Sequence, residues 1–479
     1  MNKELKRVSI AVLIMFVALL CSSTVVSVFQ VDNLRVDSRN VRTMYDSYSA
    51  ERGPILVAGK PIAESKASKD QYNFQRVYTA GELYSAVTGY FTLNQGTTGV
   101  EASLNDHLSG TANDQFLDKV NAILTGDKPK GAAVELTIDA KIQKAAWDAL
   151  GTRTGAVVAL NPKTGAILAL VSKPGFDPNV LASHNNQDVL SAYQKLLADP
   201  TDPLVNRTIA GDLYHPGSVF KLLVTAAAID SGKFTADSEF PNPPSLKLPL
   251  SSSVLHNAEG GNCGGGAKVS IANALRLSCN IPFAQIGAAV GQDTIGDYAK
   301  KFGYGARIKI PMSATPSLYP KNMDAPTEML SSFGQGDVRA TPLQIAMVTA
   351  GIANGGTLMQ PTVVKTVTAP NLKVIQPFEP SIYSQPISAQ TSATLRQLMV
   401  NNVNNGAASN ARISGVDVGG KTGTAQNGEG EPYTLWFTGF APANDPQVAV
   451  AVVVEKSAGF GNEVAAPIAR KVIEAVLSK

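Results

Sequence analysis

Three short motifs bring together a hydroxyl nucleophile, two amines and several small polar groups. In chain order they are Ser218-Val219-Phe220-Lys221, Ser278-Cys279-Asn280 and Lys421-Thr422-Gly423. A serine hydroxyl becomes a useful nucleophile when a base lies beside it, and a lysine can act as that base when its pKa is lowered. Ser218 is the only serine in the chain with a lysine three residues later. The set therefore predicts a serine acyl-transfer centre.

The residues around Ser218 predict the start of a buried helix. Pro216 and Gly217 precede it, and residues 219–229 are strongly apolar. Residues three apart share a helix face, so Lys221 should stack beside Ser218. Burial and a second cation both lower a lysine pKa, and Lys421 is the candidate for that cation. Taken alone, the pair could equally be an N-cap serine followed by a surface lysine.

The other two motifs supply groups that bind rather than attack. Ser278 could relay a proton between Lys221 and a leaving amine, and Asn280 could hold a substrate amide; the alternative is an ordinary capped helix end. Lys421 and the hydroxyls of the adjacent threonines would receive a carboxylate, and Gly423 would let a substrate approach the strand backbone closely. The predicted catalytic residues are Ser218, Lys221, Ser278, Asn280 and Lys421, and the predicted substrate-binding residues are Thr422, Gly423 and Thr424.

Copies of these short motifs elsewhere lack the same surroundings. A second K-T-G, Lys163-Thr164-Gly165, falls in a predicted hairpin turn, so its lysine should point to solvent. Further S-x-N triplets include those that begin at Ser38 and Ser183. His215 lies near Ser218 without the acidic neighbour of a triad, so we interpret it as loop structure. No G-x-S-x-G elbow, H-E-x-x-H or paired C-x-x-C spacing occurs, and we expect no metal and no cofactor.

The ends of the chain suggest where it acts. Lys3, Lys6 and Arg7 precede an uncharged apolar run over residues 8–29, which is long enough to cross a bilayer as a helix. The basic flank predicts a cytoplasmic N-terminus, with the rest of the chain outside the cytoplasm. A cleaved signal peptide is the alternative. The net charge of +3 in 479 residues argues against a nucleic-acid binder.

Two of the three cysteines could pair. Cys263 and Cys279 lie 16 residues apart, in a segment that we place in an oxidising compartment, where disulfides persist. We predict a disulfide that would tie the glycine-rich stretch 261–266 to the second motif. The alternative is a pair of reduced, partly buried thiols.

The pattern along the chain predicts a tail (1–7), a membrane helix (8–29), a small membrane-proximal domain (30–133) and a catalytic domain (134–479). In the last, we expect a helix at 138–150, capped by Asp139, and a hairpin of strands 155–160 and 166–171. Strands at 431–441 and 447–454 and a helix at 464–477 should end the chain, and the polar residues 401–410 read as a loop. Strands at both ends around helical segments indicate an α+β domain with one antiparallel sheet.

The chain resembles the class B penicillin-binding proteins, the monofunctional peptidoglycan D,D-transpeptidases, and within them the actinobacterial penicillin-binding protein A type. The three motifs carry the resemblance. So do several further segments, namely Arg52-Gly53-Pro54-Ile55, Lys173-Pro174-Gly175-Phe176, Asn206-Arg207, Tyr214-His215-Pro216-Gly217, Gly334-Gln335-Gly336, Thr341-Pro342-Leu343-Gln344 and Ala353-Asn354-Gly355-Gly356. Val219, where many relatives have Thr, and Cys279 depart from the usual pattern.

The resemblance implies a penicillin-binding, serine β-lactamase-like transpeptidase fold, an antiparallel sheet with helices on both sides, on a small N-terminal pedestal. It implies an acyl-enzyme on Ser218 and an oxyanion hole from the backbone N–H groups of Ser218 and Thr424. Stem peptides ending in D-Ala-D-Ala would be substrates in cell-wall synthesis during growth and division, β-lactams would inhibit, and a polytopic membrane glycosyltransferase would be the partner. A D,D-carboxypeptidase, a β-lactamase and a catalytically minor divisome scaffold are the alternatives.

Overall fold

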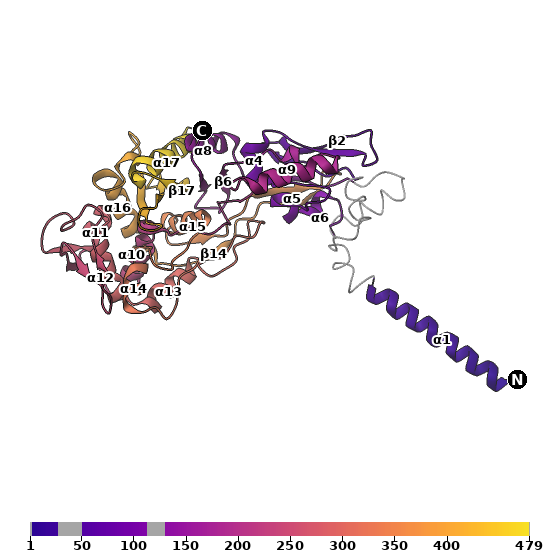
Figure 1. Cartoon of the computed structure of the whole chain (residues 1–479), viewed down its shortest axis with the longest axis horizontal. Helices are drawn as coiled ribbons and strands as arrows, with labels where there is room; N and C mark the ends of the chain where they lie inside the picture. The colour runs from indigo at the N-terminus through magenta and orange to yellow at the C-terminus, as the bar shows by residue number, and fades with distance from the viewer. Residues whose placement is uncertain (1, 27–49, 113–129, 479) are drawn as a thin grey trace.

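The computed structural model describes residues 2–26, 50–112 and 130–478. Figure 1 shows a long helix, α1 (Asn2–Thr24), that projects away from a two-part body. The part nearer α1 carries the first strands of the chain, and the larger part carries the C-terminus. The S-x-N triplet at Ser38 lies outside the described residues.

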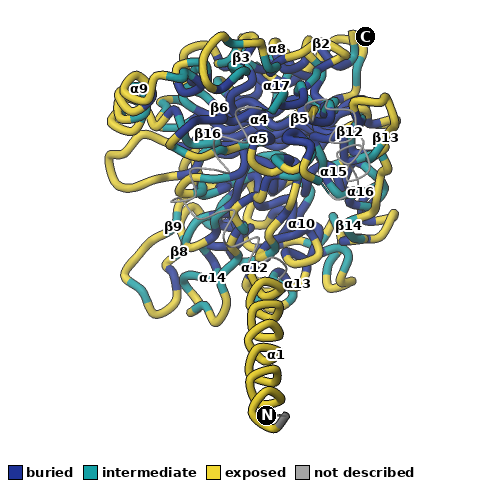
Figure 2. Tube along the Cα trace, turned by 90° about the vertical axis from the view of Figure 1, so that its right-hand side faces the viewer, coloured by how far each residue is buried: buried dark blue, intermediate teal, exposed yellow. Residues whose placement is uncertain are grey.

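The N-terminal helix is long and apolar enough to cross a membrane. The qualifying span runs from Lys3 to Thr24, and none of its most apolar stretch is buried in the protein. In Figure 2 the described residues of α1 are exposed, whereas the centre of the body is buried. An N-terminal signal sequence would have the same character, so length and composition alone do not separate the two.

A six-stranded sheet forms the part of the body nearer α1. Its order is β13-β12-β4-β1-β2-β3. The strands are β1 (Ile55–Val57), β2 (Lys60–Ala67), β3 (Phe74–Tyr78), β4 (Ala133–Leu136), β12 (Val364–Thr368) and β13 (Val374–Gln376). The sheet thus combines early strands with two strands from far later in the chain, and the predicted domain boundary at 133/134 falls inside β4.

Short helices complete this part of the body. They are α4 (Gly81–Thr88), α5 (Gly99–Ser103) and α6 (Asn105–Leu108), and the more exposed α9 (Asn186–Ala198) lies over the same end of the molecule (Figure 1). Asn179, in the 3-10 turn Pro178–Val180, joins the two parts. Its amide donates to the carbonyl of Tyr78 at 2.9 Å and accepts from the Tyr78 N–H at 2.9 Å.

A five-stranded antiparallel sheet forms the centre of the larger part, in the order β15-β16-β17-β5-β6. The strands are β5 (Gly155–Leu160), β6 (Ile167–Lys173), β15 (Gly419–Ala425), β16 (Tyr433–Ala441) and β17 (Val448–Ser457). Because successive side chains of a strand point to opposite faces, Val157 and Ala159 join one apolar cluster while Ala156 and Val158 join the other. Both faces are therefore covered, and β5 is buried throughout.

Helices pack on both faces of this sheet, as expected. On one face lie α8 (Ala140–Leu150) and the terminal α17 (Gly461–Leu477), and on the other lies the fully buried α15 (Pro342–Ala353). The Asp139 side chain accepts from the N–H groups of Lys141 and Ile142, so it is the predicted N-cap of α8. The chain therefore has the expected α+β architecture.

A helical region below the sheet holds the first two motifs. It contains α10 (Lys221–Asp230), α11 (Ile271–Leu277), α12 (Asn280–Val290), α13 (Gln292–Lys301), α14 (Ala325–Ser331) and, beside β15, α16 (Ala389–Asn405). Short strand pairs connect them, namely β7 (Glu239–Pro241) with β10 (Lys268–Ser270), β8 (Leu246–Lys247) with β9 (Val254–Leu255), and β11 (Leu358–Met359) with β14 (Ile382–Ser384).

Two local expectations were wrong. Residues 401–405, predicted as loop, are the last turn of α16, because Asn402 is buried there and donates its side-chain amide to the Gly420 carbonyl at 2.9 Å. The terminal helix begins at Gly461, three residues earlier than predicted, because the Glu463 side chain accepts the Phe460 N–H and caps the first turn. The strand and helix boundaries elsewhere agree to within a few residues.

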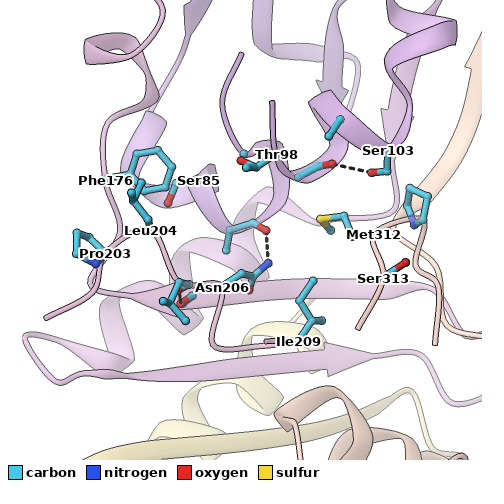
Figure 3. Close-up of a pocket in the computed structure, with 17 residues that line it drawn as sticks. Ser85, Thr98, Ser103, Phe176, Pro203, Leu204, Asn206, Ile209, Met312 and Ser313 are labelled. Atoms are coloured by element: carbon cyan, nitrogen blue, oxygen red, sulfur yellow. Dashed lines mark hydrogen bonds between the residues drawn. The ribbon is translucent and has the colours of Figure 1, made fainter. Parts of the chain in front are cut away.

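A cavity of about 400 Å³ lies between the two parts of the body. Residues of α4 and α5 line one side, and some of the residues in the segments 172–176, 203–209 and 311–313 line the other (Figure 3). Asn206 spans the junction by donating to the Ala86 carbonyl at 2.7 Å. The cavity has no charged lining residue, and none of the residues predicted for catalysis or substrate binding faces it.

A buried ionic cluster holds the membrane-proximal part together. Glu101 is fully buried and accepts from Arg52 and Arg76, whose side chains are also buried. Burial acts to raise the pKa of Glu101, but the two arginines outweigh it and hold the pKa below its ordinary value. The Arg52 guanidinium group also donates hydrogen bonds to Asn105 and to a backbone carbonyl. The Arg76 guanidinium group donates to two further backbone carbonyls. Removing any one of these three side chains would leave an unpaired charge in the interior.

Glu101→Ala should therefore destabilise the membrane-proximal part by about 3–5 kcal/mol, because two buried arginines lose their counter-charge. Glu64→Ala breaks an exposed ion pair with Lys66 and should cost at most about 1 kcal/mol. Thermal unfolding of the two variants, read at the first transition, compares them. Equal shifts would contradict this role of the cluster.

Candidate active site

The predicted nucleophile lies on a turn of 3-10 helix, Gly217–Val219, that leads directly into α10. Gly217 has a φ of +55°, and its N–H donates to the Gly334 carbonyl at 2.9 Å. A Cβ at Gly334 would lie 2.1 Å from the Gly217 carbonyl oxygen, so only glycine fits there. Ser218 is half-buried, and Lys221, one turn later, is completely buried.

The second motif lies where α11 ends and α12 begins. Ser278 ends α11 in the left-handed region, with φ 62° and ψ 36°, and Asn280 is the first residue of α12. Cys279 cannot cap α12 with a side-chain oxygen. The buried Asn257 does so instead, because its Oδ1 accepts from the N–H groups of Asn280 at 3.0 Å and Ile281 at 3.1 Å.

The structure contains the predicted disulfide between Cys263 and Cys279, whose Cα atoms lie 5.7 Å apart. Cys279 is 1% exposed, so the bridge joins the buried central residue of the second motif to the glycine-rich loop. Asn242, itself fully buried, holds that loop from the other side by donating to the Cys263 carbonyl and accepting its N–H. The second motif is thus fixed by a helix cap and by a covalent bridge.

The third motif lies on β15, the edge strand of the central sheet. Lys421 is fully buried, and its ammonium group donates to the Ser278 hydroxyl at 2.7 Å and to the Thr422 carbonyl at 3.0 Å. The Lys221 ammonium group donates to the Ser278 carbonyl at 2.7 Å and to Asn280 Oδ1 at 2.9 Å. Both lysines therefore bind Ser278, and the three motifs meet through it.

The surroundings of the two lysines lower their pKa values. Burial, and then the charge of Lys421, lower the pKa of Lys221 well below its ordinary value. Burial lowers the pKa of Lys421 to about 7. The rings of Phe283 and Phe333 lie 5.3 and 5.9 Å from Lys221 Nζ and contribute to its apolar surroundings. A lowered pKa increases the fraction of Lys221 that is an unprotonated amine, which is the form that a base must take.

Gly423 allows β15 to approach the segment that contains Ser218. A Cβ there would lie 3.0 Å from the Pro216 carbonyl oxygen and 3.3 Å from a methyl group of Val219. Gly217 in turn faces Ala425 at similarly short distances. Two glycines thus let the nucleophile's turn and the third motif's strand lie in direct contact.

Thr422 of the third motif and Thr424, which follows the motif, differ in the hydrogen bonds that their hydroxyl groups can make. The Thr422 hydroxyl donates its proton to the Ala407 carbonyl at 3.2 Å. The Thr424 hydroxyl accepts the Gly461 N–H at 3.2 Å, which leaves its own proton free to donate. Thr424 is therefore better placed than Thr422 to bind an anion.

The copies of the short motifs, and His215, do not join this hydrogen-bonded group. Lys163 is on the turn between β5 and β6, exposed, and forms an ion pair with Asp445. Asn185, in the triplet that begins at Ser183, caps α9. His215 is half-buried in the segment before Ser218, and its Nδ1 contacts Arg339 at 2.9 Å. The structure thus joins four of the predicted site residues by hydrogen bonds, namely Lys221, Ser278, Asn280 and Lys421, and leaves these other residues outside.

Sequence reasoning missed three residues that build the site. Asn257 caps α12, and Gly334 accepts the N–H of Gly217 in the turn that contains Ser218. Trp436 of β16 donates its indole N–H to the His215 carbonyl at 3.0 Å. Each acts across a long sequence separation. Gly334 stood in a segment that carried the family resemblance, but no local pattern marks Asn257 or Trp436 as parts of the site.

Comparison with known proteins gives matches over almost the whole chain. Residues 155–474 match the penicillin binding protein transpeptidase domain, and residues 52–134 match the penicillin binding protein A dimerisation domain. The peptidoglycan D,D-transpeptidases PbpA of Mycolicibacterium smegmatis and Mycobacterium tuberculosis are each 39% identical to the chain, over 100% of it and 99% of theirs. The solved structures of M. tuberculosis penicillin-binding protein A as ceftriaxone and imipenem acyl-enzyme complexes superpose with TM-scores of 0.87 and 0.86. These share 38% and 39% identity and cover 90% of this chain and 100% of theirs.

The number of alkyl adducts on the unfolded protein, measured by mass spectrometry, should give the number of free thiols. Without reductant we expect one adduct, at Cys21, and after reduction three, because the chain has three cysteines and two are bridged. Replacing Cys263 and Cys279 together by serine should lower the free energy of unfolding by about 3 kcal/mol, since a loop of this size is released. Three adducts before reduction would refute the bridge.

Proposed function

The chain belongs to the class B penicillin-binding proteins of the penicillin-binding protein A type, and from that premise we propose that Ser218 is its acylated nucleophile. The protein is a peptidoglycan D,D-transpeptidase that forms acyl-enzymes and is inhibited by β-lactams. One observation carries the assignment to residues: Lys221 lies buried one turn after Ser218, in a hydrogen-bond chain that runs through Ser278 to Lys421.

In the acylation step, the neutral Lys221 amine takes the proton of Ser218 Oγ as the oxygen attacks the carbonyl carbon of the penultimate D-alanine. The Oγ–C bond forms, and the C–N bond to the terminal D-alanine then breaks. The proton reaches the departing amine through the Ser278 hydroxyl. The backbone N–H groups of Ser218 and Thr424 stabilise the oxyanion. The amine of a second stem peptide then attacks the ester by the reverse steps and releases Ser218.

Asn280 and Lys421 have supporting roles in this mechanism. Asn280 Oδ1 holds the Lys221 amine in place, and its side-chain amide also donates to the His256 carbonyl at 3.3 Å. Lys421 and the Thr424 hydroxyl receive the substrate's terminal carboxylate, which favours the charged form of Lys421. Thr422 braces the strand through Ala407 more than it binds substrate. Gly423 keeps the strand within reach of Ser218.

The membrane arrangement belongs to the same proposal. Residues 8–29 anchor the protein in the cell membrane with residues 1–7 in the cytoplasm, and the body lies outside. Residues 30–133 form the pedestal and residues 134–479 the transpeptidase domain. The exposed apolar α1 and the two matched domains support this division. A polytopic membrane glycosyltransferase supplies the glycan strands whose peptides are cross-linked.

A fluorescent penicillin tests the nucleophile. The full chain in detergent should form a covalent adduct that lasts for hours, and Ser218→Ala should form none while keeping its melting temperature. Ser183→Ala, in the S-x-N triplet that lies outside the site, should label like the wild type. Labelling of Ser218→Ala at the wild-type level would overturn the assignment, and rapid loss of label from the wild type would indicate a β-lactamase.

The pH dependence tests the base. Because Lys421 lowers the pKa of Lys221, acylation should fall as acid protonates Lys221, and Lys421→Met should move that acidic limb to higher pH. Acylation rates between about pH 5 and 9, measured by stopped flow, locate the limb in each variant. Lys163→Met, in the exposed K-T-G, is the matched control and should leave the limb unchanged. A limb that stays in place in Lys421→Met, or moves to lower pH, would contradict the coupling.

A further inference from the structure

The segment that leads to Ser218, residues 213–217, has an irregular backbone, yet it fixes the position of the nucleophile. On one side it pairs with the chain around Ala340. The Tyr214 N–H donates to the Ala340 carbonyl at 3.1 Å, and the Ala340 N–H donates back at 2.8 Å. The Gly217–Gly334 bond extends this contact. These bonds hold the segment against the helical region but not against the sheet.

Trp436 attaches the same segment to the sheet. Its ring is fully buried, and its indole N–H donates to the His215 carbonyl at 3.0 Å. Trp436 also pairs directly with Gly423 across β15 and β16. One side chain therefore contacts the segment of the nucleophile while its backbone holds the strand of the third motif.

Tyr214 fixes the orientation of that indole. The two rings pack edge to face, with centroids 5.8 Å apart and planes at 83°. The Tyr214 hydroxyl donates to Glu455 of β17. Arg207, 5% exposed, donates to the same carboxylate oxygen at 2.8 Å, and its remaining N–H groups donate to the carbonyls of Thr201 and Asp202. The contacts that hold Trp436 and Tyr214 in place therefore end at the carboxylate of Glu455, which the buried Arg207 binds.

We propose that Trp436 and Tyr214 are positioning residues for acylation, which set the distance between Ser218 and the β15 backbone at Thr424. The inference rests on the proposed role of Ser218 as nucleophile. An oxyanion hole built from Ser218 on one segment and Thr424 on another works only if the two segments keep their spacing. A displacement of about 1 Å can cost a hundredfold in rate. If Trp436 and Tyr214 only packed in the core, replacing them would lower the stability of the protein and leave the acylation rate of the folded enzyme unchanged.

The test separates the binding of penicillin from its chemical step. Stopped-flow acylation at varied concentrations gives the dissociation constant of the initial complex and the rate constant of acylation. Trp436→Phe keeps an aromatic ring but loses the indole N–H, and Tyr214→Phe loses only the hydroxyl. We expect the acylation rate constant to fall at least about tenfold in Trp436→Phe and by a smaller factor in Tyr214→Phe. The dissociation constant should stay within about twofold.

Tyr304→Phe is the matched control. Tyr304 is buried, and its ring also packs edge-on against Phe220, 5.8 Å away, but its hydroxyl has no hydrogen-bond partner among the described residues. Removing it should leave both constants unchanged. Glu455→Gln, which keeps an acceptor for Tyr214, should retain more of the acylation rate than Glu455→Ala.

The outcomes are distinguishable. If the wild type labels, Ser218→Ala does not, and Trp436→Phe acylates at the wild-type rate with only a lower melting temperature, the positioning role is refuted while the nucleophile stands. If Ser218→Ala labels like the wild type, the proposed function fails first. A fall in the acylation rate constant of Tyr304→Phe equal to that of Tyr214→Phe would also overturn the inference.

Discussion

Two buried lysines that share one serine are the constraint on which the site depends. Burying an ammonium group is costly unless its protons are satisfied. Here the Ser278 carbonyl and Asn280 Oδ1 each accept a hydrogen bond from Lys221. The Ser278 hydroxyl and the Thr422 carbonyl each accept one from Lys421. Ser278 lies in the left-handed region at the end of α11, and its carbonyl and hydroxyl are separate acceptors for the two lysines.

The rest of the helical region can be understood as support for that geometry. Asn257 caps α12, the bridge from Cys263 immobilises Cys279, and Asn242 fixes the loop that carries Cys263. Without them the second motif could relax, and the lysines would regain water and their ordinary pKa values. The proposed chemistry depends on this cost, because a lowered pKa makes more of the Lys221 amine available as a base.

The sequence alone shows the three motifs of the candidate site because each motif is local and its spacing follows helix or strand periodicity. Ser218 and Lys221 are one turn apart, and Asp139 and the hairpin of β5 and β6 are set by capping and turn residues. Contacts between distant segments were not predictable in this way. Three such contacts join residues tens to hundreds of positions apart. They are the cap that Asn257 provides for α12, the hydrogen bond from Trp436 to the His215 carbonyl, and the pairing of β12 with β4. Likewise Asn402 remains helical, against its local propensity, because it is buried against β15.

The pKa of Lys221 tests the account most directly. NMR titration of the protein with ¹³C at lysine Cε, with Lys221→Met to identify the resonance, measures it without substrate. We expect Lys221 to titrate well below the ordinary lysine value of about 10.4, and to titrate higher in Lys421→Met. A Lys221 that titrates near the ordinary value in the folded protein would mean that it is protonated at neutral pH, and would contradict its role as the base.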